Sequence, residues 1–171
     1  ALLLIKHQFE ALKKQTQTMR WIAATDSLTG VRSKRYLIDN GEAYIKSKSR
    51  SPVWGVLVDI DHFKKINDTL GHIKGDHVLS EMGDKLNSSF EDSMIVRFGG
   101  EEFCILMPNM QHDDALQRAE ALRSDLESLK PAGVDVTVSI GLVSSLDFPG
   151  EGLSEFLGLA DKALYAAKEN G

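Results

Sequence analysis

Apolar and polar positions recur along this chain with two different periods, and these periods predict helices and strands in turn. Up to about Ala24 the apolar positions follow steps of three and four residues, which indicates one long helix. These positions are Leu2, Ile5, Phe9, Leu12, Met19 and Ala23, with Thr16 as the one polar member. The spacing favours the seam of a coiled coil between two chains. A single helix packed on its own domain would show a similar stripe, so both interpretations stay open.

Beyond Ala24 the pattern predicts alternating strands and helices. Strands are expected at Val53–Ile60, which is apolar throughout, at residues 134–140, which alternate, and in a hairpin over residues 94–107. A loop is expected over residues 144–152. Helices are expected to begin at Ser33, His62, Gly75, His112 and Ser154. Without repeats or low-complexity tracts, this order indicates an α/β sandwich.

Composition places the chain among ordinary globular proteins. Its 171 residues suffice for one domain with an appendage, and 42% are hydrophobic and 26% charged. The net charge of −5 argues against a nucleic-acid surface. It does not argue against a nucleotide, because a divalent cation and a few lysines can neutralise a triphosphate locally. The single cysteine, Cys104, can form no disulfide within the chain, which fits a reducing compartment.

The pair Gly99-Gly100 separates two β-prone runs and predicts a hairpin. Glycine enters the positive-φ conformations of tight two-residue turns, so we expect the turn at this pair. Glu101 and Glu102 follow directly and should point to opposite faces, because side chains alternate along a strand. Two glutamates at a hairpin tip can also be merely solvated. Arg97, just before the glycines, could pair with a neighbouring acid.

A second acidic stretch changes this balance. Asp59 and Asp61 lie at the end of the strand predicted at Val53–Ile60, where a sheet edge and its loops form sites. Two acid-bearing strand ends in one small domain would suit Mg²⁺, a cation that prefers oxygen ligands and keeps phosphates or water in its shell.

Four stretches together resemble one known family. Residues 99–103 resemble the signature of the GGDEF family of diguanylate cyclases, in its GGEEF form. Residues 26–30, 59–76 and 160–168 agree with further motifs of that family in order and spacing. The resemblance covers the chain from about Thr25 to its end.

The resemblance implies an N-terminal signalling helix, residues 1–24, and a bacterial catalytic domain, residues 25–171. It implies a mixed, antiparallel-containing sheet flanked by helices, as in nucleotidyl cyclases and polymerase palms. The implied reaction condenses two GTP into cyclic di-GMP and two pyrophosphates with Mg²⁺ or Mn²⁺. Because two nucleotides must face each other, the active form would be a homodimer. The alternative is a catalytically silent module that binds GTP or cyclic di-GMP.

By the same resemblance, five residues at the two acidic stretches would carry the chemistry. Asp59, Glu101 and the backbone carbonyl of Ile60 would be metal ligands. Glu102 is assigned to the ribose 3′-hydroxyl or to its deprotonation. Asp61 would assist, or would only stabilise the turn.

Five further residues would hold the substrate by resemblance. Asn67 and Asp76 would hydrogen-bond a guanine edge, although Asp76 could instead be a helix N-cap. Phe63 and Lys64 lie where backbone N–H groups would meet the terminal phosphates. Lys168 matches a phosphate-contacting lysine, and a lysine in isolation would be a surface residue.

One departure from the family pattern concerns the product. Many members carry Arg-x-x-Asp before the hairpin, where product binds and inhibits. Here the two anchor positions are Phe90 and Ser93, so we expect no product inhibition at that site. The chain begins with Ala1 rather than Met, and we expect a piece of a longer protein with a sensor or membrane segment upstream. We expect the catalytic domain itself in the cytoplasm.

Overall fold

One five-stranded sheet organises the domain, with the strand order β1-β3-β4-β2-β5. The computed structural model describes residues 2–48, 51–147 and 152–170. The strands are β1 (Arg32–Ser33), β2 (Val53–Ile60), β3 (Met94–Arg97), β4 (Glu102–Pro108) and β5 (Val138–Ser144). The pair β1–β3 is parallel and the other pairs are antiparallel, which confirms the mixed sheet.

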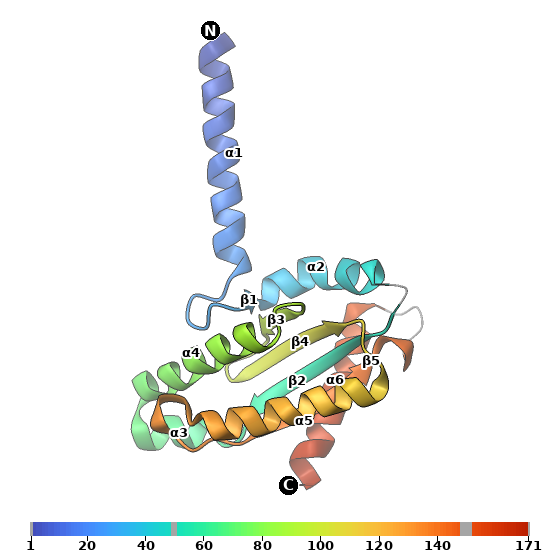
Figure 1. The fold of residues 1–171 in the computed structure, drawn as a ribbon. Helices are drawn as coiled ribbons and strands as arrows, with labels where there is room; N and C mark the ends of the chain where they lie inside the picture. Colours follow the sequence, from blue (N-terminus) through green and yellow to red (C-terminus); the bar gives the residue numbers. More distant parts are fainter. Residues whose placement is uncertain (1, 49–50, 148–151, 171) are drawn as a thin grey trace.

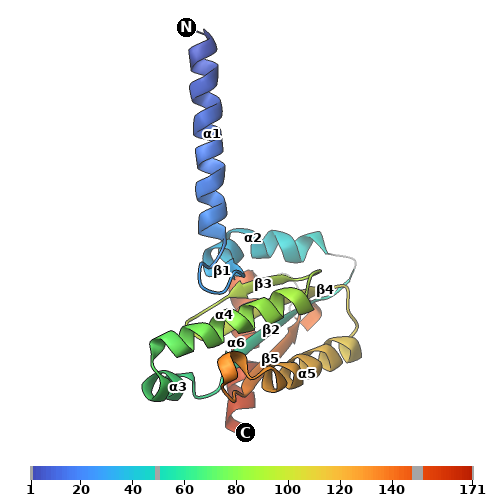
Figure 2. The same ribbon diagram turned by 60° about the vertical axis from the view of Figure 1, so that its left-hand side comes forward.

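Helices cover both faces of this sheet (Figures 1 and 2). The six α-helices are α1 (Leu2–Ala24), α2 (Lys34–Ser47), α3 (Phe63–Leu70), α4 (His72–Ser89), α5 (His112–Leu129) and α6 (Leu153–Asn170). One core cluster joins the sheet to α3, α4 and α5, and a second joins the opposite face to α2 and α6. Helix α1 projects away from the domain.

Strand β2 lies inside the sheet between β4 and β5 and is buried along its whole length. Val56, Val58 and Ile60 belong to the core cluster under α4 and α5, whereas Leu57 belongs to the cluster under α6. Because side chains alternate along a strand, Asp59 shares the face of Leu57. The predicted central strand therefore delivers a carboxylate to the α6 side of the sheet.

The predicted two-residue turn at Gly99-Gly100 is wrong. The strands end at Arg97 and begin again at Glu102, so four residues form the loop. Among the described residues the glycines with positive φ are others, and neither Gly99 nor Gly100 is one of them. A Cβ on Gly99 would collide with the Glu102 carboxylate, whereas Gly100 faces open space. The turn conformation therefore does not require these glycines, and a Cβ at Gly99 would displace the end of the Glu102 side chain.

One helix and one strand, α4 and β5, start several residues away from the predicted positions. Helix α4 begins at His72, directly after Gly71 with φ 86°, so Asp76 lies inside the helix and is not its N-cap. Helix α5 begins at His112, as expected, with Gln111 as its N-cap residue. Strand β5 begins only at Val138, because its ladder partner β2 ends at Ile60.

Other local predictions are confirmed. Ser33 caps α2, and its hydroxyl accepts a hydrogen bond from the Tyr36 N–H at 3.2 Å. Gly71 closes α3, as expected for a residue without Cβ. Of the loop expected over residues 144–152, Ser145–Asp147 forms a 3₁₀ turn, and residues 148–151 lie outside the described residues.

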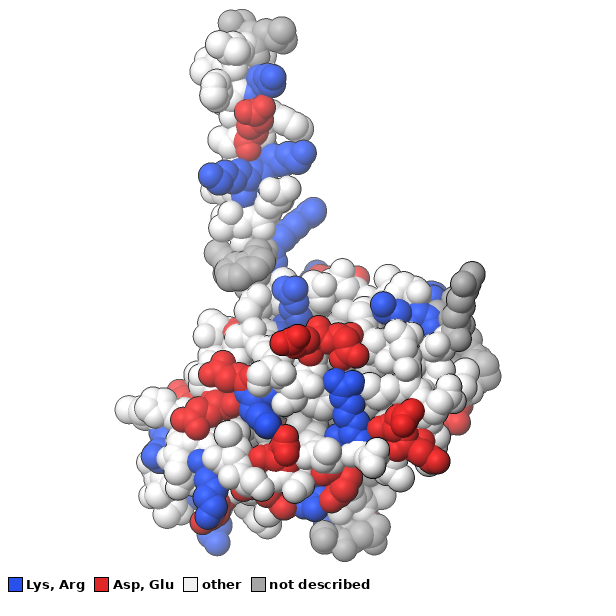
Figure 3. All heavy atoms as spheres, viewed as in Figure 1, with Lys and Arg blue, Asp and Glu red and all other residues white. Residues whose placement is uncertain are grey.

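The apolar stripe of α1 stays exposed. Ile5, Phe9, Leu12 and Met19 are each more than 60% exposed, so these side chains do not pack on their own domain. Figure 3 shows wide uncharged surface between the charged side chains of α1. The stripe is therefore free to pair with another helix, as the coiled-coil interpretation requires; the side chain of Leu2 lies outside the described residues. No described helix has both the length and the apolar character needed to cross a membrane.

Replacing Gly141 with alanine should destabilise the fold. A Cβ there would collide with the Ala160 carbonyl oxygen and the Leu164 backbone nitrogen of α6. Overpacking of this kind costs about 1–3 kcal/mol, which urea unfolding would detect. The control is Gly158→Ala on the exposed side of α6, where nothing lies within 4 Å and a gain of up to about 1 kcal/mol is expected. Equal stability of Gly141→Ala and the unchanged protein would contradict this packing.

Candidate active site

Asp59 is a buried carboxylate at the end of the central strand. Its side chain is 7% exposed, and its Oδ1 forms an ion pair with the Lys168 Nζ at a distance of 2.7 Å. Lys168 comes from the last turns of α6, the helix that covers this face of the sheet. The lysine expected at the phosphates thus lies beside the first expected metal ligand.

Glu102 lies directly opposite Asp59, because these two residues are register partners on β4 and β2. Burial raises the pKa of the Glu102 carboxyl, and the charge of Asp59 raises it further. Asp161 of α6 and Glu101 act in the same direction, whereas Lys168 partly offsets them. This end of the sheet therefore carries more negative charge than its lysine balances.

Lys168 remains a cation in this setting. Burial alone would lower the pKa of its ammonium group, but the hydrogen bond and charge of Asp59 outweigh that effect, with help from Glu102 and Asp61. The net result is a raised pKa for Lys168. One positive charge thus faces several carboxylates across the β2 end.

Glu101 lies in the loop before β4 and flanks Ile60. Its backbone carbonyl accepts a hydrogen bond from the Ile60 N–H at 3.3 Å. Because β4 begins only at Glu102, the expected alternation of the two glutamates does not apply to Glu101. The structure therefore brings Asp59, Ile60 and Glu101 to the same end of two neighbouring strands.

These residues fit a cation that is completed by other donors. Within residues 2–48, 51–147 and 152–170, no three side chains of Asp, Glu, His or Cys are arranged to hold a metal ion. Carboxylates with a neighbouring backbone carbonyl are hard oxygen donors, which Mg²⁺ takes with phosphates or water in the remaining positions.

The start of α3 lies next to this acidic end. Phe63 is buried at the first position of the helix, Lys64 is exposed, and the N-cap residue His62 provides no side-chain hydrogen bond. The first N–H groups of a helix have no partner within the helix. They are thus available to an anion, as the sequence interpretation of Phe63 and Lys64 requires.

Asn67 and Asp76 come together where α3 and α4 meet. The side chain of Asn67 lies so close to Gly75 that a Cβ there would collide with it. Asp76 follows Gly75 and is exposed. The Asn67 amide thus contacts the residue that precedes Asp76, and an amide and a carboxylate are groups that can hydrogen-bond a ligand edge.

Arg97 connects this site to the base of α1. Its Nη1 donates to Asp26 Oδ1 at 3.2 Å, and its Nη2 donates to the Gly100 carbonyl at 2.8 Å. Burial alone would raise the pKa of Asp26, but hydrogen bonds from Thr29 and the charge of Arg97 hold it below its ordinary value. The sequence left the acid unidentified, since the partners lie 71 residues apart.

Asp61 contacts the residue just before β5 and one residue within β5. Its carboxylate accepts hydrogen bonds from Thr137 and Ser139. No local sequence pattern marks either hydroxyl, because the contact depends on the register of β5.

Replacing Glu102 with glutamine should stabilise the protein at neutral pH. A raised pKa means that the folded state binds the proton more tightly than the unfolded chain. The ionised carboxylate therefore costs stability at pH values above its folded pKa, and this cost disappears below the ordinary value of 4.5. Unfolding free energies measured from about pH 4 to pH 8 should show a growing advantage of Glu102→Gln. An advantage that is absent at pH 8 or independent of pH would contradict this.

Comparison with known proteins identifies relatives of this fold and site. A family model described as "Diguanylate cyclase, GGDEF domain" matches residues 23–171. The response regulator PleD of Caulobacter vibrioides is 39% identical over 160 residues, which cover 88% of this chain and 35% of PleD. The probable diguanylate cyclase DgcT of Escherichia coli is 34% identical over 172 residues, which cover 96% of this chain and 37% of DgcT. The chain thus spans about a third of the length of these relatives.

A solved structure extends the likeness to α1. The coiled coil and GGDEF domain of DgcB from Caulobacter crescentus, in complex with c-di-GMP, aligns with a TM-score of 0.88 at 26% identity. The alignment covers 99% of this chain and 93% of that one. Since the family model spans all but the first 22 residues, the chain belongs to the GGDEF family of diguanylate cyclases.

Proposed function

We propose that residues 25–171 are a catalytic domain that condenses two GTP into cyclic di-GMP and two pyrophosphates. Residues 1–24 would form the helix that pairs two chains. The observation that carries this proposal is the unbalanced acidic end of β2 and β4, beside the uncapped start of α3. It offers carboxylates for a cation and free N–H groups for phosphates within one site.

Asp59, Glu101 and the backbone carbonyl of Ile60 would hold Mg²⁺ or Mn²⁺. When bound, such a cation neutralises phosphate charge and lowers the pKa of an attacking hydroxyl. The pairing of Asp59 with Lys168 supports this assignment, because a cationic group already lies 2.7 Å from the buried carboxylate. Lys168 would then turn toward a phosphate, from a side chain that is 42% exposed and therefore has room to move.

Substrate recognition would divide between phosphates and base. The backbone N–H groups of Phe63 and Lys64 would receive the terminal phosphates. Asn67 and Asp76 would hydrogen-bond the guanine edge, since a carboxylate accepts from guanine N1–H and N2–H₂. Adenine presents no such donors in that position, so it would leave the carboxylate unpaired.

Glu102 would accept the proton of the ribose 3′-hydroxyl or hold that hydroxyl in place. Its raised pKa supports the first role, because a general base works best when its pKa approaches the working pH. The carboxylate also lies opposite Asp59, next to the proposed cation ligands.

The reaction needs two nucleotides that face each other, so we propose a homodimer as the active form. The exposed stripe with Ile5, Phe9, Leu12 and Met19 supports this, since two such helices would bury it together. Correct positioning of two reactants can lower a barrier by about 7–11 kcal/mol.

We further propose that product does not inhibit at the positions before the hairpin. Phe90 is 2% exposed there and stacks under the Arg118 guanidinium at 4.6 Å. Ser93 donates to Asp92, which also accepts from Arg118. Neither position offers the arginine or the aspartate that would anchor a guanine and a phosphate.

Incubation of the chain with GTP and Mg²⁺, followed by separation of the products, tests the function. Cyclic di-GMP and pyrophosphate are expected in a ratio of one to two. Glu101→Ala should lower turnover by about 10²- to 10³-fold, as removal of groups that stabilise reacting charge generally does. The control is Glu42→Ala, an exposed position paired with Lys46 on α2, which should keep full turnover. GTP binding without any product would instead support the silent binding module.

Replacing Asp76 with asparagine tests the guanine site. In asparagine an NH₂ donor replaces one of the two carboxylate oxygens that would accept from guanine. The KM for GTP should therefore rise by about 5- to 150-fold, which corresponds to about 1–3 kcal/mol. The control is Asp84→Asn, an exposed position further along α4, which should leave KM unchanged. Initial rates over a range of GTP concentrations give both values, and an unchanged KM in Asp76→Asn would exclude this role.

A further inference from the structure

We propose that Asp61 is a positioning residue, which holds the start of α3 in place through the hydroxyl groups of Thr137 and Ser139. This inference rests on the proposed function, because it concerns the turn that would receive the phosphates. We name the three residues the hydroxyl clamp.

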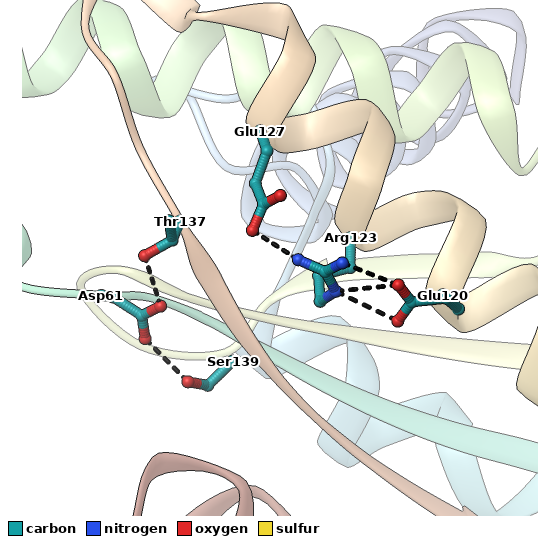
Figure 4. A network of polar contacts seen from close by, with 6 residues as sticks. All are labelled: Asp61, Glu120, Arg123, Glu127, Thr137 and Ser139. Atoms are coloured by element: carbon teal, nitrogen blue, oxygen red, sulfur yellow. Dashed lines mark hydrogen bonds and ion pairs between the residues drawn. The ribbon is translucent and has the colours of Figure 1, made fainter. Parts of the chain in front are cut away.

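The hydroxyl clamp uses both carboxylate oxygens and the backbone N–H of Asp61. Its Oδ2 accepts from the Thr137 hydroxyl at 2.7 Å, and its Oδ1 accepts from the Ser139 hydroxyl at 2.7 Å. Its backbone N–H donates to the Thr137 carbonyl at 2.9 Å. Figure 4 shows the carboxylate between the two hydroxyls, apart from the ion pairs of Arg123 on α5.

The clamp closes where the regular ladder ends. The last register pairs of β2 and β5 are Asp59 with Ser139 and Ile60 with Val138. Asp61 and Thr137 occupy the next pair of positions, beyond both strands. The side chain of Asp61 therefore extends the pairing by one step, directly between Asp59 and α3.

The residue that follows is strained and depends on its surroundings. His62 has φ 55° and ψ 28°, a left-handed conformation that a residue with a Cβ adopts only when its neighbours enforce it. Its carbonyl already accepts the N–H groups of Lys65 and Ile66, which begin α3. The clamp before His62 and the helix after it together fix where the N–H groups of Phe63 and Lys64 point.

If the Asp61 carboxylate acted directly on the substrate, the order of activity among the variants would be reversed. Asp61 is one of the carboxylates that raise the pKa of Lys168, so its charge also reaches the acidic end of the sheet. A direct role needs that charge, whereas positioning needs the hydrogen bonds. Asparagine at 61 removes the charge but keeps one acceptor and adds a donor that a hydroxyl can accept. Thr137→Val with Ser139→Ala removes both hydroxyl donors and keeps the charge.

The experiment measures kcat and KM for GTP in these two variants. The double variant should lose about 10- to 100-fold in kcat/KM, since small misplacement of binding groups has effects of this size. Asp61→Asn should lose less kcat/KM than the double variant. Thr137→Ser in a chain that keeps Ser139 retains both hydroxyls, so its kcat/KM should match that of the unchanged protein. The control is Ser145→Ala, which removes the hydroxyl that accepts from Val53 N–H at the other end of β2. It should leave kcat/KM unchanged.

Amide hydrogen exchange over residues 61–65 without nucleotide provides a readout that needs no activity. Exchange should be faster in the double variant than in Ser145→Ala, even if the unchanged protein makes no cyclic di-GMP. Absence of product from the unchanged protein would overturn the proposed function alone. Unchanged kcat/KM in the double variant, or a larger loss in Asp61→Asn, would overturn the positioning role. If the double variant does not fold, Thr137→Val alone is compared with Asp61→Asn by the same criteria.

Discussion

The structure depends on a carboxylate that is buried at the end of its central strand. An ionised carboxylate removed from water is unfavourable unless partners compensate it. The side chain of Asp59 is 7% exposed, and its Oδ1 lies 2.7 Å from the Lys168 ammonium group, while the carboxyl group of Glu102 lies opposite on β4. Burial and the charge of Asp59 raise the pKa of Glu102, which reflects the excess of negative charge at this site. The fold therefore gathers more carboxyl groups than lysines at this end of the sheet, which is the feature behind the proposed cation site.

Much of the fold is visible in the sequence because it follows periodicity. The apolar run of β2 with its final Asp59 identifies a buried strand with an acid at its end, and the three-four spacing of α1 identifies a long helix. Paired glycines do not distinguish a two-residue turn from a four-residue loop, since neither Gly99 nor Gly100 has the positive φ of the expected turn. The start of α4 was misplaced because Asp76 suits an N-cap, while the positive φ of Gly71 decides where the helix begins.

Contacts that depend on register stayed hidden from the sequence. Arg97 meets Asp26 across 71 residues, and Asp61 meets Thr137 and Ser139 across 76 and 78. No local pattern marks such partners, because strand pairing decides which side chains meet. Arg97 also donates to the Gly100 carbonyl, so the base of α1 and the signature loop share one guanidinium.

We propose that the acidic end of β2 and β4 receives a triphosphate only together with a divalent cation. Calorimetric titration of the chain with GTP, once with Mg²⁺ and once with a chelator in its place, measures this dependence. GTP should bind with Mg²⁺ and lose most of its affinity without it, because free triphosphate would face Asp59, Glu101 and Glu102 uncompensated. Equal affinity under both conditions would exclude a divalent cation at this end of the sheet.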